Sequence, residues 1–223
     1  MTTTVRPDPR DESASDDGRH ARRARNREAV ISALLSLHDE GDLSPSTEAI
    51  AERAGLSTRS VFRYFADVDD LAQAAVNRQQ ERLAILFARP VDAAGTRSDR
   101  VRHAVAHRID LLEAMGNVGR VARLRAPFHP AVADELRRVR ALMRRQLGQA
   151  LAPELDQLSA QRGSRLLAAV DVACSFEAYD LLRSDIGLSS HEAAALMVES
   201  VHALLDAVPD MTGESRTTAV VSA

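Results

Sequence analysis

The part of the sequence that most constrains the fold is residues 46–65, STEAIAERAGLSTRSVFRYF. Ile50 and Ala54 recur at helical spacing, which predicts a short helix with an apolar stripe. Gly55 then occupies a position that favours positive φ, and Ser57 can cap a second helix. Two short helices joined by a tight glycine turn form a helix-turn-helix.

The second of these helices is expected to have an apolar inner face and a polar outer face. The residues expected to pack inward are Val61, Phe62 and Phe65, together with Ile50, Ala54 and Leu56 of the preceding helix and turn. The residues left to face outward are Thr58, Arg59, Ser60, Arg63 and Tyr64. Hydroxyl, guanidinium and phenol groups bond to phosphates and base edges, so this face is expected to bind DNA. The alternative is a helical hairpin that binds nothing.

The segment resembles the DNA-binding domain of the TetR (tetracycline-repressor-like) transcription regulators, T-x-x-x-I-A-x-x-A-G-V-S-x-x-x-[LF]-Y-x-[YH]-F-x-x-K-x-x-L. The matching residues are Thr47, Ile50, Ala51, Ala54, Gly55, Ser57, Phe62, Tyr64, Phe65 and Leu71, with Leu56 in place of Val. Phe62 and Arg63 replace the more usual Tyr-x pair, and Asp69 stands where the family commonly has a Lys that touches a phosphate. The resemblance is specific over about residues 27–75 and implies a DNA-binding transcription regulator.

A cluster of arginines precedes the motif, with five of them and no acid between Gly18 and Arg27. Positive charge at a helix N-terminus opposes the macrodipole, so attraction to phosphate is the expected reason for the cluster. A solvated helix start is the alternative. The net charge of −3 argues against a protein that coats nucleic acid over its whole surface. The residues predicted to bind DNA are Arg22, Arg23, Arg27, Thr47, Ser57, Thr58, Arg59, Ser60, Arg63 and Tyr64.

Helical periodicity continues through the rest of the chain without an alternating strand pattern, which predicts an all-α fold. An N-terminal three-helix DNA-binding domain is expected over residues 19–66 and a helical effector-binding and dimerisation domain over 67–208, with disordered tails at 1–18 and 209–223. The expected helices are 19–38, two in the helix-turn-helix, 67–88, 99–115, 119–125, 131–151, 159–184 and 190–208. The sequence has no membrane span and no signal peptide, and its single cysteine, Cys174, fits a reducing compartment, so a cytoplasmic protein is expected.

His103, His107 and Asp110 share one helical face in the expected second domain. Two histidines four residues apart can bind a metal, but Ala104 replaces the catalytic Glu of the H-E-x-x-H motif. Solvent exposure or the lining of an effector pocket are the alternatives, and neither a metal nor another cofactor is predicted.

Asp171 and Glu177 interrupt an apolar run, LLAAVDVACSFEAYDLL, where carboxylates are costly unless paired. Asp171, Cys174 and Ser175 are expected on one face of a continuous helix. Asp171 either pairs with an arginine of another helix or anchors a ligand, and Cys174 is expected to be a small buried filler. No glycine-rich phosphate loop, G-x-S-x-G or C-x-x-C motif occurs, so an enzyme is not predicted.

The last two expected helices resemble the dimerising helix pair of the family. Their apolar residues are more numerous than one small core needs and predict a four-helix interface between two subunits. The alternative is that they only close the core of the monomer. These residues are Phe176, Tyr179, Leu182, Leu196, Val201, Leu204 and Leu205.

These features together predict a homodimeric repressor that binds a palindromic operator and is released by a small molecule. An activator of the same family, or a ligand-binding or scaffold protein without an operator, are the alternatives. The residues predicted to bind the effector are Phe87, His103, His107, Met115, Phe128, Met143, Asp171, Ser175, Phe176 and Tyr179. The scarcity of aromatic residues favours an aliphatic or acyl effector over a planar polycyclic one.

Overall fold

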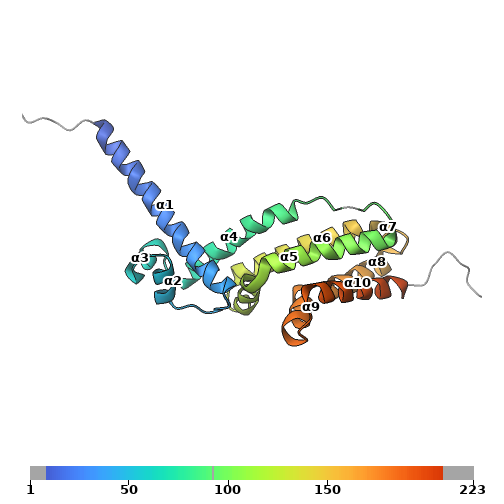
Figure 1. Cartoon of the computed structure of the whole chain (residues 1–223). Helices are drawn as coiled ribbons and strands as arrows, with labels where there is room; N and C mark the ends of the chain where they lie inside the picture. The colour runs from blue at the N-terminus through green and yellow to red at the C-terminus, as the bar shows by residue number, and fades with distance from the viewer. Residues whose placement is uncertain (1–8, 92, 208–223) are drawn as a thin grey trace, which may run out of the picture. The chain divides into compact units, whose positions relative to one another are not determined.

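The computed structural model describes residues 9–91 and 93–207, and every regular element in these ranges is helical (Figure 1). The predicted all-α fold is confirmed. The chain divides into two compact units, the first comprising Met1–Ile85 and Met115–Leu136 and the second comprising Leu86–Ala114 and Arg137–Ala223. This division differs from the boundary expected after residue 66, because most of the fourth helix packs with the first unit. Among the described residues, no helix combines the length and apolar character of a membrane span.

The first unit contains α1 (Pro9–Asp39), α2 (Thr47–Arg53), α3 (Thr58–Tyr64) and most of α4 (Val68–Phe87). α1 begins at Pro9 rather than near residue 19, so residues 9–18, expected to be disordered, are helical. The rest of that expected tail, and the tail at 209–223, lie outside the described residues. One cluster of buried apolar side chains joins the helices and includes Val30, Leu35, Ile50, Val61 and Phe65.

Local signals define the ends of α2 and α3. The hydroxyl of Ser46 accepts a hydrogen bond from the backbone N–H of Ala49, and that of Ser57 accepts one from the N–H of Ser60. Gly55 has φ of +66° between the two helices, a conformation that a side chain would strain. The helix-turn-helix predicted from the sequence is therefore present with the expected Ser57 cap and glycine turn, and Ser46 caps its first helix as well.

The second unit contains the first part of α5 (Arg97–Arg125), most of α6 (Pro130–Ala150), α7 (Ala152–Leu155), α8 (Ala160–Ala173), α9 (Phe176–Asp180), the π-helix η1 (Leu181–Asp185) and α10 (Ser190–Asp206). Its fully buried side chains include Val101, Val105, Leu112, Val170 and Met197. α8 and α10 pack against each other. α10 begins with a complete capping box, in which the side chains of Ser189 and Glu192 each bond to the backbone N–H of the other.

Two interruptions shape the helices of the C-terminal part of the chain. In α5, Gly116 adopts φ of 44° and ψ of −140°, so the expected break after Met115 is confirmed at this glycine. The single helix expected over 159–184 is wrong, because α8 ends at Ala173 and the hydroxyl of Ser175 caps a new helix, α9. Asp171 and Ser175 therefore do not share one continuous helical face.

Candidate nucleic-acid interface and ligand cavity

The outer face of α3 carries Arg59, Phe62 and Arg63, which are all exposed, while Thr58 and Ser60 are half-buried. Phe62 is 54% exposed, so the prediction that it packs inward is wrong. Tyr64 is only 9% exposed, so the prediction that it faces outward is also wrong. The inward stripe of α3 consists of Val61 and Tyr64, and Phe65 is buried directly after it.

Tyr64 is buried because its hydroxyl has partners within the domain. Asn26 of α1 donates a hydrogen bond to the Tyr64 hydroxyl at 2.9 Å, and Arg63 donates another at 2.7 Å. These donors hold the pKa of the Tyr64 phenol below its ordinary value, Asn26 having the largest effect. The guanidinium of Arg63 also lies over the Tyr64 ring, 5.0 Å from its centre. Tyr64 therefore joins α3 to α1 and orients Arg63.

Arg59 makes no hydrogen bond or ion pair with any residue that the structure describes. The hydroxyl of Ser57, by contrast, caps α3 and lies 2.9 Å from the hydroxyl of Ser60. Thr47 is half-buried in the first turn of α2. Among the residues predicted to bind DNA, the side chain of Arg59 is thus available to an external partner, whereas Ser57 and Ser60 already have local roles.

The basic residues of α1 extend the charged surface of this unit. Arg22, Arg23 and Arg27 are all exposed. Arg27 lies over the ring of Phe65, 4.8 Å from its centre, and the charge of Arg22 is near enough to Tyr64 to lower the pKa of that phenol slightly. α1 therefore brings positive charge close to the C-terminal end of α3.

Asp69, which stands where the family commonly has a Lys, makes ion pairs inside the first unit. Its carboxylate lies 3.2 Å from the Arg125 guanidinium and 3.6 Å from His129 Nε2. The nearby Asp67 accepts the N–H of Asp70 at 2.8 Å and so caps the start of α4. The carboxylate of Asp70 in turn accepts the N–H of Ala66, one residue before Asp67, at 3.0 Å.

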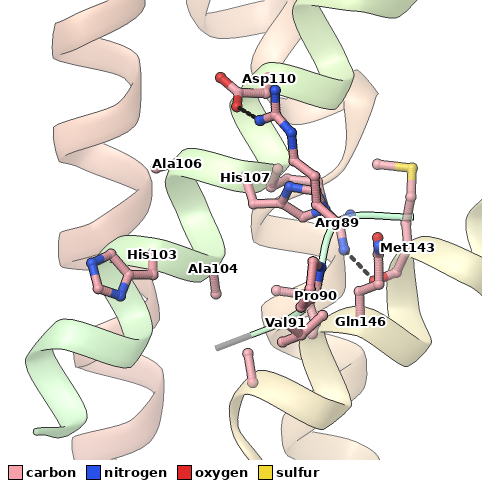
Figure 2. A pocket seen from close by; sticks show the side chains of 13 residues that line it. Arg89, Pro90, Val91, His103, Ala104, Ala106, His107, Asp110, Met143 and Gln146 are labelled. Atoms are coloured by element: carbon pink, nitrogen blue, oxygen red, sulfur yellow. Dashed lines mark hydrogen bonds and ion pairs between the residues drawn. The ribbon is translucent and has the colours of Figure 1, made fainter. Parts of the chain in front are cut away.

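A cavity of about 260 Å³ lies within the second unit, lined by α5, α6 and the segment that follows α4 (Figure 2). Three of the residues predicted to bind an effector line it, His103, His107 and Met143. The other lining residues are Arg89, Pro90, Val91, Ala104, Ala106, Arg108, Asp110, Gln146, Leu147 and Ala150. His103 is exposed, whereas His107 is half-buried and Met143 is buried.

The structure places the remaining predicted effector residues elsewhere. Phe87 lines a second cavity of about 320 Å³ that shares Arg89, Pro90, Val91 and Gln146 with the first. Met115 is buried in the first unit, and Phe128, in that same unit, is 79% exposed. Ser175 is used as the cap of α9, and Phe176 is buried in the core. Tyr179 is buried as well, where it donates a hydrogen bond to Glu113 at 2.9 Å.

Arg108 is a buried residue of the cavity wall that was not among the residues predicted from the sequence. Its guanidinium is 3% exposed and donates to the carbonyls of Met143 at 2.8 Å and Cys174 at 3.2 Å, and it lies 3.4 Å from the Asp171 carboxylate. Asp171 therefore pairs with an arginine of another helix, which was the first of its two expected roles. The sequence feature that could have indicated its burial is its position on the apolar stripe of α5, three residues after the buried Val105.

The arginines of the cavity are already engaged. Arg89 donates to Asp110 at 2.6 Å, and Arg108 holds α5, α6 and α8 together. Burial raises the pKa of the Cys174 thiol to about 11, so this cysteine is the small buried filler that was predicted. Among the described residues, no group of three or more His, Cys, Asp and Glu side chains could hold a metal ion.

His107 and Gln146 are the polar residues of the cavity wall that lack saturated hydrogen bonding. The Gln146 amide nitrogen donates to the Phe87 carbonyl at 3.2 Å, but its Oε1 atom is buried and has no partner among the described residues. His107 Nε2 is likewise buried and has no partner of strict hydrogen-bond geometry, but the Gln146 side chain is close enough to act as its hydrogen-bond partner, which by itself raises the pKa of His107. Burial lowers the pKa of His107, and the charge of Arg89 adds to this effect. His107 is therefore neutral at pH 7.

Comparison with known proteins supports these observations. Residues 30–75 match the family model of the bacterial regulatory proteins of the tetR family. The fold resembles a transcriptional regulator from Rhodococcus sp. Rha1, with a TM-score of 0.64 and 18% identity over 82% of this chain and 99% of that one. It also resembles a TetR transcription regulator from Haloarcula marismortui, with a TM-score of 0.60 and 17% identity over 82% and 97% of the two chains. No curated protein matches the sequence.

Proposed function

Since the chain is a member of the TetR family of bacterial regulators, we propose that this DNA-binding regulator is a homodimeric repressor released from a palindromic operator by a small molecule. The observation that carries the proposal is the exposed, unengaged guanidinium of Arg59 on α3, beside the exposed Phe62. An arginine in the major groove reads guanine through O6 and N7, and an apolar side chain contacts the thymine methyl. α3 thus presents two base-reading groups on one face.

The arginines of α1 supply the electrostatic part of the proposed interface. Arg22 and Arg23 are exposed and have no hydrogen bond or ion pair to the described residues, so both are available to phosphates. Each phosphate contact makes the slope of the logarithm of the binding constant against the logarithm of the salt concentration steeper by about one. Thr47 at the start of α2 and Arg63, oriented by Tyr64, are proposed to contact the DNA backbone.

The proposed dimer uses the C-terminal helices. Large apolar side chains remain exposed on successive elements there, Val172 on α8, Leu181 on η1 and Leu196 on α10. The apolar surplus is smaller than the sequence suggested, because Phe176, Tyr179, Val201 and Leu205 are buried within the monomer. A two-fold dimer requires a palindromic operator with half-sites about 34–36 Å apart, or a multiple of that distance.

The cavity of the second unit is the proposed effector site. A ligand that prefers one conformation shifts the population towards it, by no more than its differential affinity allows. The non-helical backbone at Gly116, where the two units divide α5, is the proposed hinge. The coupling expected between effector and DNA is about 1–3 kcal/mol.

The test is fluorescence anisotropy with the DNA upstream of the protein's own gene. Arg59→Ala should relax discrimination at one base position by about 1–3 kcal/mol. Arg53→Ala is the matched control, since Arg53 is an exposed arginine of the same domain whose guanidinium is already bound by Glu40 at 2.6 Å and 2.8 Å. Unchanged specificity in Arg59→Ala, or an equal loss in the control, would contradict the proposed interface.

A further inference from the structure

The second cavity of the second unit, of about 320 Å³, differs in charge from the first. It is bounded by α6 and by the end of α4 with the segment that follows. Two arginines line it, Arg89 and Arg145, and none of the described residues in its wall is Asp or Glu. A cavity lined by charges of one sign attracts a ligand of the opposite sign, so an anion is favoured here.

The two arginines differ in whether their charge is already compensated. Arg89 donates to the carboxylate of Asp110 at 2.6 Å (Figure 2). Arg145 is exposed and forms neither a hydrogen bond nor an ion pair within the part of the chain that the structure describes. One uncompensated positive charge therefore remains on the cavity wall, which suits a ligand group with a single negative charge.

A second donor lies beside Arg145. Gln149 follows it by four residues in α6, so the two side chains share one face of the helix, and both line the cavity. Gln149 is exposed, and its side chain has no hydrogen bond to a described residue. A guanidinium group can bind both oxygens of a carboxylate, and the amide nitrogen of Gln149 can donate to one of them.

The first cavity provides space for an apolar group attached to such a carboxylate. The two cavities share Pro90 and Val91, and the wall of the first continues with the buried side chains of Met143 and Leu147. None of the described residues that line the first cavity is Phe, Tyr or Trp, so its apolar wall is aliphatic. Its volume of about 260 Å³ is just below the range of about 300–1,000 Å³ usual for ligand pockets, and a ligand that occupies both cavities would fall within that range.

We propose that the effector is an aliphatic monocarboxylate of medium chain length that occupies both cavities. Its carboxylate is bound by Arg145 and Gln149, and its chain passes Val91 to end against Met143 and Leu147. This placement leaves the ion pair between Arg89 and Asp110 intact. The assignment rests on the proposed function of the first cavity as the effector site, and it names the class of molecule that acts there.

The test compares three probes of equal chain length with the full-length protein by isothermal titration calorimetry at pH 7: octanoate, 1-octanol and octylammonium. We expect octanoate to bind about 3- to 10-fold more tightly than 1-octanol, because a hydrogen bond between charged groups is stronger than one that involves a neutral hydroxyl. Octylammonium should bind most weakly. Butanoate should bind at least about 10-fold more weakly than octanoate, since each buried methylene adds to affinity.

Failure of these preferences would overturn the ligand class. Equal affinity for octanoate and 1-octanol, a preference for octylammonium, or no binding of octanoate up to millimolar concentration would exclude the carboxylate. Equal affinity for butanoate and octanoate would exclude the aliphatic contact.

Variants separate the contact of the carboxylate from the contact of the chain. Arg145→Gln should weaken octanoate about 3- to 10-fold and leave 1-octanol unchanged. Arg165→Gln is the matched control, because Arg165 is an exposed arginine of α8 in the same unit, has no bonded partner among the described residues and lines neither cavity. Val91→Ala should weaken octanoate and 1-octanol alike. Parental affinity for octanoate in Arg145→Gln, or an equal loss in Arg165→Gln, would refute the proposed contact.

DNA binding is measured separately, so that the two proposals fail in different ways. If octanoate binds with the expected selectivity but leaves operator affinity unchanged, the ligand class stands and the release mechanism is wrong. If the protein binds operator DNA and octanoate does not bind, the regulator stands and the ligand class is wrong.

Discussion

Replacement of Arg108 by Met tests the arrangement of the second unit most directly. The substitution keeps much of the side-chain volume but removes the donors to the carbonyls of Met143 and Cys174 and the partner of Asp171. Loss of one member of a buried ion pair costs about 3–5 kcal/mol. Asp171 is about a quarter exposed and has Arg144 at 3.8 Å as a second partner, so we expect the lower end of this range, about 3 kcal/mol.

The assay is urea unfolding followed by circular dichroism, supported by thermal unfolding. A loss of about 3 kcal/mol corresponds to a melting temperature lower by roughly 6–12 °C for a chain of this size. Arg144→Met is the control, because Arg144 is about one-third exposed and more distant from Asp171, and it should cost no more than about 1 kcal/mol.

A second substitution separates the charge of Arg108 from its shape. Arg108→Lys retains the positive charge, but its ammonium group lacks the planar array of donors with which a guanidinium bonds to several acceptors at once. The stability of this variant should therefore lie between those of the parent and Arg108→Met. If Arg108→Met lost less than about 1 kcal/mol, or no more than Arg144→Met, the role of Arg108 in joining α5, α6 and α8 would be refuted.

Three further results are expected. Phe62→Ala should fold normally, since Phe62 is 54% exposed. The parent protein should bind operator DNA more weakly when uracil replaces thymine, and Phe62→Ala should show no such loss, because it lacks the contact to the thymine methyl. If the parent binds both DNAs equally well, the methyl contact is excluded. Leu196→Arg should give a folded monomer in sedimentation, because Leu196 is 40% exposed, whereas Leu205→Arg should destabilise the monomer itself; a persistent Leu196→Arg dimer would exclude this face. The pKa of His107 in the folded protein lies below its ordinary value of 6.5, so the unfolded chain binds the proton first and the free energy of unfolding should fall as the pH decreases below 6.5. His107→Asn should show a smaller fall in urea titrations. An identical pH profile in the variant would refute the lowered pKa of His107.

The sequence by itself determined the helix-turn-helix and the all-α class, because the signals for them are local. A Ser57 hydroxyl that caps α3 acts within three residues, and Gly55 allows positive φ whatever surrounds it. The break at Gly116 was visible for the same reason. These features depend on backbone chemistry that the neighbouring residues already specify.

The face that α3 turns inward was decided only by tertiary structure. A helix of seven residues has apolar groups on more than one side, and periodicity alone could not choose between Phe62 and Tyr64. The choice depends on Asn26, 38 residues away in the sequence, whose amide satisfies the buried Tyr64 hydroxyl. Phe62 needs no such partner and occupies the outer face.

The cavity and its polar groups were likewise decided by contacts between distant segments. Arg108 bonds to residues 35, 63 and 66 positions away, and no local pattern could show that a buried arginine would find these acceptors. Gln146 lines the cavity beside the segment that follows α4, where its amide nitrogen donates to the Phe87 carbonyl, 59 positions away in the sequence. Hydrogen-bond satisfaction in a buried site is a property of the assembled helices, and the sequence alone does not specify it.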